Sequence, residues 1–273
     1  METKYDACVI GCGEIGSAVL ADLSRKNGSL KLIGYDVSKK AQENWFMGHA
    51  SPPWPQVVTN EIPPAKVYFI CVWTMDAVLE VLSDHMVKNY SELVFLETTV
   101  DPTRYADLQK AVSDGGYWHK LVLFPHRFNP GDNEHHIFNL DRLIGGIDQY
   151  ATLDALNWLT KHNIMEEKYL HVVDPKVAVM SKVVENAYRA WEIILAQELK
   201  KSCNSIGMDF DALRRAVNTK WNIDIREARD GVKGKCLPKD LGLFNKTFPS
   251  NTASQMLYLL NEQFIKDNDN NKH

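Results

Sequence analysis

The sequence GCGEIG, residues 11–16, limits most strongly what this chain can fold into. It follows a short apolar run at residues 6–10 and precedes an amphipathic stretch, rich in alanine and leucine, that reaches about residue 23. Glycines spaced as GxGxxG between a strand and a helix allow a tight turn, close approach of backbone to a pyrophosphate, and close helix–strand packing. We therefore expect a dinucleotide at the amino end of this helix. The alternative is a glycine turn in an α/β fold that binds no nucleotide.

The second predicted strand, residues 31–35, ends at Asp36. Asp36 stands twenty positions beyond Gly16, which is where an acidic residue follows the glycine turn in dinucleotide-binding folds. A carboxylate at this place can accept hydrogen bonds from both ribose hydroxyls of NAD and repels a 2′-phosphate. NAD is therefore the expected cofactor.

Three further apolar runs, at residues 66–72, 93–96 and 120–124, alternate with helical patterns at 76–88 and 103–113. Uninterrupted apolar runs are typical of parallel strands covered on both faces, so we predict an α/β, Rossmann-type, doubly wound parallel sheet. Strand ends line the cofactor crevice of such a sheet, although a single threonine after a strand is more often a cap than a ligand. The expected cofactor-binding residues are Gly11, Gly13, Glu14, Ile15, Gly16, Asp36, Val72, Thr74 and Thr99.

Composition narrows the class of protein further. The 273 residues, 45% of them hydrophobic, can build one large or two modest domains. A net charge of −4 gives no electrostatic footprint for nucleic acid. The five cysteines lack paired or metal-type spacing, no leader is evident, and no apolar run approaches the ~18 residues of a membrane span. We expect a reduced, cytoplasmic protein.

The segment 124–146 is polar, broken by proline and longer than a simple connector, which favours an active-site loop. Its histidines, His126, His135 and His136, have no clustered acid or cysteine beside them. We therefore expect no metal site here.

The longest helical pattern covers residues 175–205, and Gly207 marks its end. Lys182 and Asn186 stand one turn apart, with Arg189 three residues further, on a strip of their own. A lysine and an amide so placed can act on one substrate oxygen, as proton donor or acceptor and as oxyanion donor; a solvated face is the alternative. The apolar face of this helix is predicted at Met180, Val184, Ala187, Trp191, Ile194 and Leu195. Shorter helices are predicted at 211–218, capped by Asp209, and at 251–266.

The stretch GVKGKCLPKD, residues 231–240, places Cys236 among glycine and lysine residues. Nearby positive charge favours a thiolate and a small neighbour admits a substrate carbon, so Cys236 is a candidate nucleophile. The alternative is a buried cysteine beside a proline-containing turn.

Several motifs together resemble the UDP-glucose/GDP-mannose dehydrogenase family. The segments KVVENAYRA (182–190) and GVKGKCLPKD are similar to its K-x-x-E-N and G-V-G-G-x-C-x-x-K-D motifs. In the first half, GCGEIG, Asp36, the Ser51-Pro52-Pro53 stretch, ETTVDPT (97–103), PHRFNPG (125–131) and DRLIGG (141–146) agree with it as well. The resemblance covers residues 1 to about 266, and DRLIGG is most similar to the branch that oxidises UDP-N-acetylhexosamines.

The resemblance implies roles for individual residues. Cys236 would capture an aldehyde as a thiohemiacetal and then a thioester, with Lys182 and Asn186 stabilising the oxyanion and Asp240 assisting proton transfer. Hydride would leave twice, so that two NAD would be consumed. Thr99 would stand near the nicotinamide, His126 would belong to the catalytic set, and the expected substrate-binding residues are Arg127, Asn129 and Lys233.

Three departures from the family pattern qualify this expectation. The family continues into a third, nucleotide-binding domain, whereas this sequence stops after the second. His126 stands where the family has a glutamate involved in acyl hydrolysis, although imidazole can act as a base. Lys233 stands in place of a glycine, where it could block a bulky sugar or hold an anionic group.

We therefore expect an NAD-binding Rossmann domain at 1–174, an all-α, dimerisation-type domain at 175–266 and a disordered tail at 267–273. The predicted activity is NAD-dependent oxidation of a primary alcohol, on a nucleotide-sugar-like or nucleotide-like substrate, through Cys236. A two-electron dehydrogenase of the β-hydroxyacid type and a catalytically silent NAD-binding subunit stay open. The resemblance also implies a homodimer through the helix at 175–205.

Overall fold

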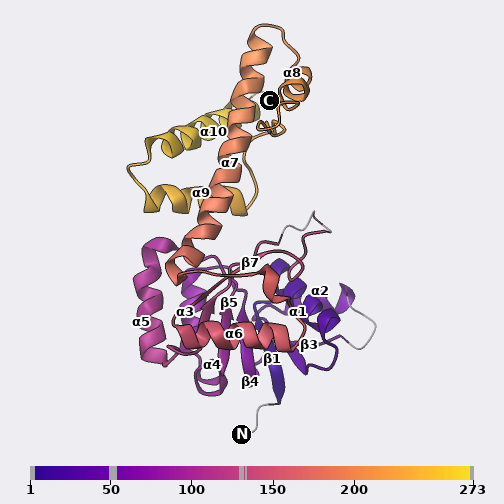
Figure 1. Ribbon diagram of the computed structural model, residues 1–273, viewed down its shortest axis with the longest axis vertical. Coiled ribbons are helices and arrows are strands. Elements are labelled where there is room, and N and C mark those ends of the chain that lie inside the picture. Colours follow the sequence, from indigo (N-terminus) through magenta and orange to yellow (C-terminus); the bar gives the residue numbers. More distant parts are fainter. Residues whose placement is uncertain (1–3, 49–53, 129–131, 133, 271–273) are drawn as a thin grey trace. The chain divides into compact units, whose positions relative to one another are not determined.

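The computed structural model describes residues 4–48, 54–128, 132 and 134–270. The chain divides into two compact units, Met1–Met180 and Ser181–His273. The first unit holds the sheet and the second is helical, as Figure 1 shows.

The first unit is built on an eight-stranded sheet with the order β3-β2-β1-β4-β5-β6-β7-β8. Neighbouring strands run parallel except β6 and β7, which are antiparallel. From β1 the chain builds the sheet first toward β2 and β3 and then, from β4 on, in the opposite direction. Ligands of such sheets bind at this topological switch point, between β1 and β4. The strands are β1 (Tyr5–Ile10), β2 (Leu32–Tyr35), β3 (Gln56–Val58), β4 (Ala65–Ile70), β5 (Leu93–Leu96), β6 (Leu121–Leu123), β7 (Arg142–Gly146) and β8 (Leu170–Val172).

Helices cover both faces of this sheet. One apolar cluster joins α1 (Glu14–Lys26), α2 (Lys39–Gly48) and α6 (Gln149–Lys161) to strand residues such as Phe69 and Phe95, whose rings stack 4.6 Å apart. A second cluster joins α3 (Met75–Ser83), α4 (His85–Tyr90) and α5 (Tyr105–Gly115) to their neighbours Tyr68 and Ile70. Each large apolar side chain so buried contributes roughly 1.5–3 kcal/mol, and the alternation fixes the strand faces. The predicted doubly wound sheet is confirmed.

Some elements differ from those expected from sequence. The pattern at 76–88 forms two helices, because Asp84 ends α3 and caps α4 by accepting a hydrogen bond from Met86 N at 2.7 Å. The strands β3, β7 and β8 and the helices α2 and α6 were not expected. Short 3-10 turns occur at η1 (Pro102–Arg104) and η2 (Glu167–Tyr169).

The second unit consists of helices, which confirms the all-α prediction. They are α7 (Pro175–Ser205), which begins in the first unit, α8 (Phe210–Val217), α9 (Cys236–Thr247) and α10 (Thr252–Asn270). Gly207 follows α7 with a φ of 69°, the left-handed conformation that ends many helices. Asp209 caps α8 by accepting from Asp211 N at 2.9 Å.

The buried face of α7 is shifted from the one expected. Its core contacts come from Val183, Ala187, Ala190, Ile193 and Ile194, which pack with Val232, Leu241 and Phe244. Val184 and Leu195, expected on the buried face, are 40% and 58% exposed. The helix therefore carries apolar side chains on two sides.

Among the described residues, no helix has the length and apolarity that a bilayer crossing requires.

Candidate active site

The glycine turn after β1 is shaped by contacts with the start of the next segment. Gly11 has a φ of 88°, and a Cβ there would lie 2.9 Å from the carbonyl carbon of Cys71, just beyond β4. A Cβ on Gly16 would lie 1.9 Å from Gly11 O. Both positions therefore require glycine for the fold itself.

Gly13 has no such structural requirement. A Cβ there would meet nothing within 4 Å, and its backbone is extended, with a φ of −71°. It is the N-cap of α1, where no side chain accepts from the first N–H groups. Free N–H groups at a helix amino end bind phosphate, and a missing side chain lets a phosphate approach the backbone. The turn therefore fits the pyrophosphate of a dinucleotide.

This difference between the glycines predicts two distinct phenotypes. Gly13→Ala should leave the unfolding midpoint nearly unchanged and weaken NADH binding about tenfold or more, because the methyl group occupies the space of the phosphate. Gly16→Ala should lower the midpoint, since its Cβ collides with backbone. Thermal unfolding and NADH fluorescence titration of both variants test this. Equal effects of the two changes on binding and on stability would contradict it.

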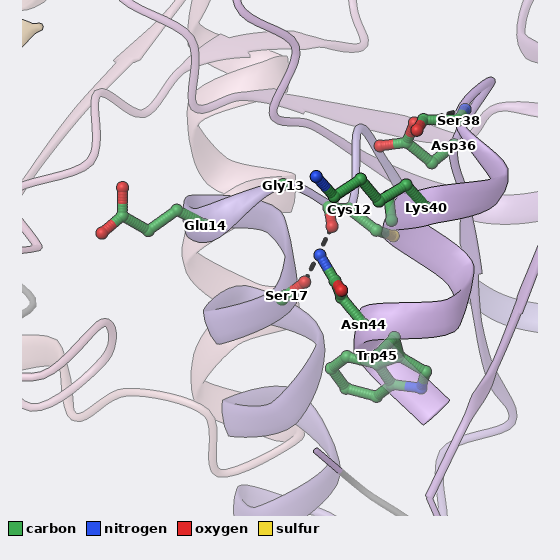
Figure 2. Close-up of a pocket in the computed structure, with 10 residues that line it drawn as sticks. Cys12, Gly13, Glu14, Ser17, Asp36, Ser38, Lys40, Asn44 and Trp45 are labelled. Carbon is green, nitrogen blue, oxygen red and sulfur yellow. Dashed lines mark hydrogen bonds between the residues drawn. The ribbon is translucent and has the colours of Figure 1, made fainter. Parts of the chain in front are cut away.

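A pocket of about 640 Å³ opens between α1 and α2, next to this turn. Figure 2 shows Asp36 on its rim and Glu14 pointing away from the other labelled side chains. Asp36 Oδ1 accepts from Ser38 N at 2.8 Å, which holds the carboxylate in place and leaves its other oxygen for a ligand. The pocket lies within the 300–1,000 Å³ range of small-molecule sites. Its lining is Cys12, Gly13, Glu14, Ser17, Asp36, Ser38, Lys40, Ala41, Asn44 and Trp45.

Cys12 lies in the same turn without being a nucleophile. Its thiol contacts Val9 O at 3.6 Å, and burial, with the nearby charge of Asp36, raises the pKa of Cys12 to about 12. Burial likewise raises the pKa values of Cys8 and Cys71 well above the ordinary value. These three thiols stay protonated near neutral pH.

The threonines after β4 and β5 serve different purposes. Thr74, expected at the cofactor, is the N-cap of α3 and accepts from Ala77 N at 3.2 Å. Thr98, not singled out from sequence, is buried and donates to Val72 O at 2.8 Å, which joins the two strand ends. Thr99 and Val72 are partly exposed beside it. Sequence offered no signal to separate Thr98 from Thr99.

A buried ion pair holds the loop after β6. Arg142 Nη2 lies 2.6 Å from Glu97 Oε2, and both side chains are fully buried. Arg142 also donates to Phe124 O at 2.8 Å and to Ile137 O at 2.9 Å, and its guanidinium lies 3.8 Å from the centre of the Phe124 ring. Burial lowers the pKa of Arg142, and the Glu97 carboxylate opposes this shift. One side chain therefore links strand ends to both ends of the loop.

The predicted catalytic and substrate residues of this loop lie at its start. His126 N donates to Glu97 O at 3.4 Å, and Arg127 Nη1 donates to Asp141 O at 3.0 Å. Both side chains are partly exposed. Asn129, like the prolines at 52 and 53, lies outside the described residues.

The other two histidines have separate partners. His135 Nδ1 lies 2.9 Å from Asp132 Oδ2, and His136 Nδ1 lies 2.7 Å from Asp22 Oδ2 on α1. Within the described part of the chain, no group of three or more His, Cys, Asp or Glu side chains could hold a metal ion.

Cys236 is the first residue of α9 in the second unit, and its side chain is exposed. The proline two residues later does not make a turn, because proline is accommodated in the first turn of a helix. The alternative of a buried structural cysteine is therefore wrong for this position. An exposed thiol at the amino end of a helix is accessible to a substrate carbon.

Lys182 and Asn186 are buried, at 8% and 3% exposure, so they do not form a solvated face. Burial lowers the pKa of Lys182, while the nearby acidic groups of Glu185, Asp240 and Cys236 oppose this shift. Asn186 Nδ2 donates to Asp240 Oδ2 at 2.6 Å. Lys182, Asn186, Cys236 and Asp240 thus lie together within the second unit, whereas Arg189 is exposed.

Asn261 of α10 fixes the loop before Cys236. It accepts from Val232 N at 2.7 Å and donates to Val232 O at 3.3 Å, and it is 4% exposed. Its role was not foreseen, because an asparagine inside a helix far along the chain gives no local signal. Lys233, the next residue of the loop, is exposed.

The chain is similar in sequence and in fold to proteins already known. Residues 176–267 match the sequence model described as UDP-glucose/GDP-mannose dehydrogenase family, central domain. A UDP-N-acetyl-D-mannosamine dehydrogenase of Methanococcus vannielii is 26% identical over 265 residues, which cover 85% of this chain and 59% of that protein. The chain therefore spans about three fifths of the length of this relative.

Solved structures give the same fold. The UDP-D-ManNAc dehydrogenase of Pyrococcus horikoshii superposes with a TM-score of 0.75 and 20% identity, over 94% of this chain and 68% of that one. A 3-hydroxyisobutyrate dehydrogenase of Mycobacterium tuberculosis gives a TM-score of 0.69 and 15% identity, over 96% and 94%. The resemblance expected from sequence is thereby confirmed, because residues 176–267 match the central-domain model of the UDP-glucose/GDP-mannose dehydrogenase family.

Proposed function

We propose that this protein is an NAD-dependent dehydrogenase that oxidises a primary alcohol of a nucleotide-sugar-like or nucleotide-like substrate to the acid through Cys236. The observation that carries this proposal is the exposed thiol of Cys236 beside buried Lys182 and the Asn186–Asp240 pair. The names of the relatives, which are UDP-sugar dehydrogenases, support the substrate class.

The cofactor proposal is supported by the residues of the first unit. Gly13 leaves room for a pyrophosphate, and Asp36 at the pocket rim offers a carboxylate oxygen to a ribose. Bound NAD⁺ would supply the acceptor of a hydride. Thr99 and His126, which sequence placed near the nicotinamide and in the catalytic set, keep those roles as part of this proposal.

The chemistry assigned to the second unit proceeds by covalent capture. The alcohol loses a proton and a hydride, and Cys236 Sγ adds to the carbonyl carbon of the resulting aldehyde. Lys182 and the second N–H of the Asn186 amide stabilise the oxyanion, and loss of another hydride leaves a thioester. Water then attacks, the C–S bond breaks and the thiolate leaves. One alcohol and one water thus reduce two NAD⁺ and release a carboxylate and three protons.

Asp240 is proposed to manage the protons of this sequence. Its Oδ2 accepts from Asn186 and its Oδ1 lies 3.3 Å from Lys239 Nζ, so the carboxylate is held while fully buried. Burial of Lys182 lowers its pKa, so its ammonium gives up a proton more readily than an exposed lysine does.

Counting NADH formed per substrate consumed tests the proposal. Two NADH per alcohol, with the acid as product, supports oxidation through a thioester. One NADH and an aldehyde or keto product favours the two-electron alternative, which a lysine and an amide one turn apart can serve without a thiol. The protein could also bind NADH but turn over none of a panel of nucleotide sugars, nucleotides and hydroxy acids. That result would favour the alternative of a catalytically silent NAD-binding subunit.

The helix α7 is also proposed to join two copies of the chain. Val184, Tyr188 and Leu195 are 40%, 56% and 58% exposed, and steps of four and seven residues return to one side of a helix. Such a stripe is typical of a helix that packs on a partner.

Charge placed in this stripe should break the association. Leu195→Glu is expected to convert a dimer to a monomer of 31.1 kDa, because a carboxylate would be buried without a partner. Lys200→Glu, at an exposed position of the same helix, is the matched control. Light scattering of both variants decides, and a wild-type protein that is monomeric at all concentrations would overturn the proposal.

A further inference from the structure

Three lysines lie within three residues of Cys236 in the sequence. Lys233 and Lys235 are exposed within three residues of the thiol, and Lys239 follows in the first turn of α9. Lys239 is engaged with Asp240, at 3.3 Å. Lys233 and Lys235 therefore present their ammonium groups at the surface beside the reactive sulfur.

The amino end of α9 adds to this positive potential. Lys235 is its N-cap and offers no side-chain acceptor to the first N–H groups, and the first turn contains no acidic residue. The amino end of a helix carries a partial positive charge, which a nearby carboxylate normally offsets. Lysines at this place instead add positive charge to it. An anion bound here would satisfy the free N–H groups and offset both sources of charge.

The buried ammonium of Lys182 independently indicates a negatively charged ligand. Lys182 is 8% exposed, close enough to Cys236 for the two charges to interact, and no hydrogen bond or ion pair joins it to another described side chain. The carboxylates whose charges act on Lys182 are those of Glu185 and Asp240, and Asp240 already binds Asn186 and Lys239. No described acidic group lies within ion-pair distance of the Lys182 ammonium, although Glu185 and Asp240 act on it from further away. An anionic ligand at Cys236 would supply a direct counter-ion to this buried cation.

The backbone of the loop accommodates the lysine at 233 without strain. The positive φ values of this loop, 87° and 90°, fall on its two glycines, Gly231 and Gly234. Among the described residues other than glycine, Asn163 alone has a positive φ, so Lys233 is not in the left-handed region. The Cε of Lys233 lies 3.4 Å from the place of a Cβ on Gly231, so its aliphatic part covers that glycine. The lysine is thus a compatible replacement whose charged end is available to a ligand.

We propose that the Cys236 site selects substrates that carry a phosphate or carboxylate close to the reacting alcohol, and that Lys233 and Lys235 bind this group. The inference rests on the proposed function for the alcohol chemistry, and it narrows the substrate class. A neutral alcohol would leave the positive charges of the loop without a partner.

Charge-selective alkylation of Cys236 tests the anion site without turnover. Cys236 is the exposed thiol, while Cys8, Cys12 and Cys203 are buried and Cys71 is partly buried. The ratio of the rate with anionic iodoacetate to that with neutral iodoacetamide cancels the thiolate fraction. We expect this ratio to exceed that of free cysteine about fivefold at low salt and to fall toward it at high salt.

The matched variants are Lys233→Gly with Lys235→Ser, and Lys200→Ala as a control on an exposed lysine elsewhere. The double variant should bring the ratio to that of free cysteine, and the control should keep the wild-type ratio. Cys236→Ser should remove the labelling and so identify the site. A wild-type ratio equal to that of free cysteine would overturn the proposal.

Substrate pairs then identify the source of the anion. NADH formation is compared between hydroxy acids and their methyl esters, between phosphorylated and unphosphorylated alcohols of one skeleton, and with nucleotide sugars. The anionic member should be preferred, with a KM that rises about tenfold in the double variant. Equal use of the neutral member would overturn the inference, whereas charge-selective alkylation without any turnover would count against the proposed oxidation alone.

Discussion

Replacing Cys236 with serine is expected to lower the rate of acid formation by about a thousandfold or more, because the thioester route loses its nucleophile. The side chain is exposed at the start of α9, so the change should leave the unfolding midpoint close to that of the wild type. NADH affinity should also be unchanged, since the glycine turn and Asp36 belong to the first unit. Turnover, thermal unfolding and NADH titration of this variant are measured together.

The outcome separates the two dehydrogenase mechanisms. If the variant still forms acid at the wild-type rate, the thioester scheme is wrong and the thiol has another purpose. Lys182→Met gives a complementary test, because both mechanisms use this lysine and turnover should fall in either case. Loss of turnover in Lys182→Met but not in Cys236→Ser would establish the two-electron route.

Sequence predicted the sheet because its signals are local. A strand, a glycine turn and a helix occupy consecutive residues, and the acidic residue after β2 stands at a set distance, so Asp36 was found at the rim of the pocket. The helix at Pro175–Ser205 was likewise predicted at both ends, by its long periodicity and by Gly207. Elements with weak periodicity, such as α2 and the three-residue strands β3 and β8, gave no comparable signal.

The second unit could be predicted only in part, because its contacts join distant residues. The proline at position 238 suggested a turn in the sequence, but it is the third residue of α9, which begins at Cys236. The shift of the buried face of α7 follows from packing against α9, which brings Asp240 to Asn186 across 54 positions. Periodicity along one helix cannot indicate which of two apolar sides its partners will cover.

Glu97 and Arg142 show why a motif can be recognised while its physical purpose is missed. Both occur in segments that carry the family resemblance, ETTV and DRLIGG, but neither was expected to be buried. In the structure they form an ion pair without solvent exposure, between the end of β5 and the start of β7. In sequence, a charged residue at the end of a strand is equally compatible with binding a ligand and with forming an ion pair inside the protein. The folded structure is needed to distinguish the two.

Arg142→Met is therefore expected to lower the free energy of unfolding by about 3–5 kcal/mol, because it removes the guanidinium that faces a buried carboxylate. It also removes the hydrogen bonds to Phe124 O and Ile137 O that hold the loop carrying His126. Glu97→Gln combined with Arg142→Met should recover part of the loss, since the buried charge is then absent. Lys110→Met, which removes the exposed pair with Asp114, is the control and should change stability little. Urea unfolding of the wild type, Arg142→Met, Glu97→Gln and the double variant gives the coupling energy. A stability of Arg142→Met equal to that of the Lys110→Met control would show that the pair does not hold the loop to the sheet.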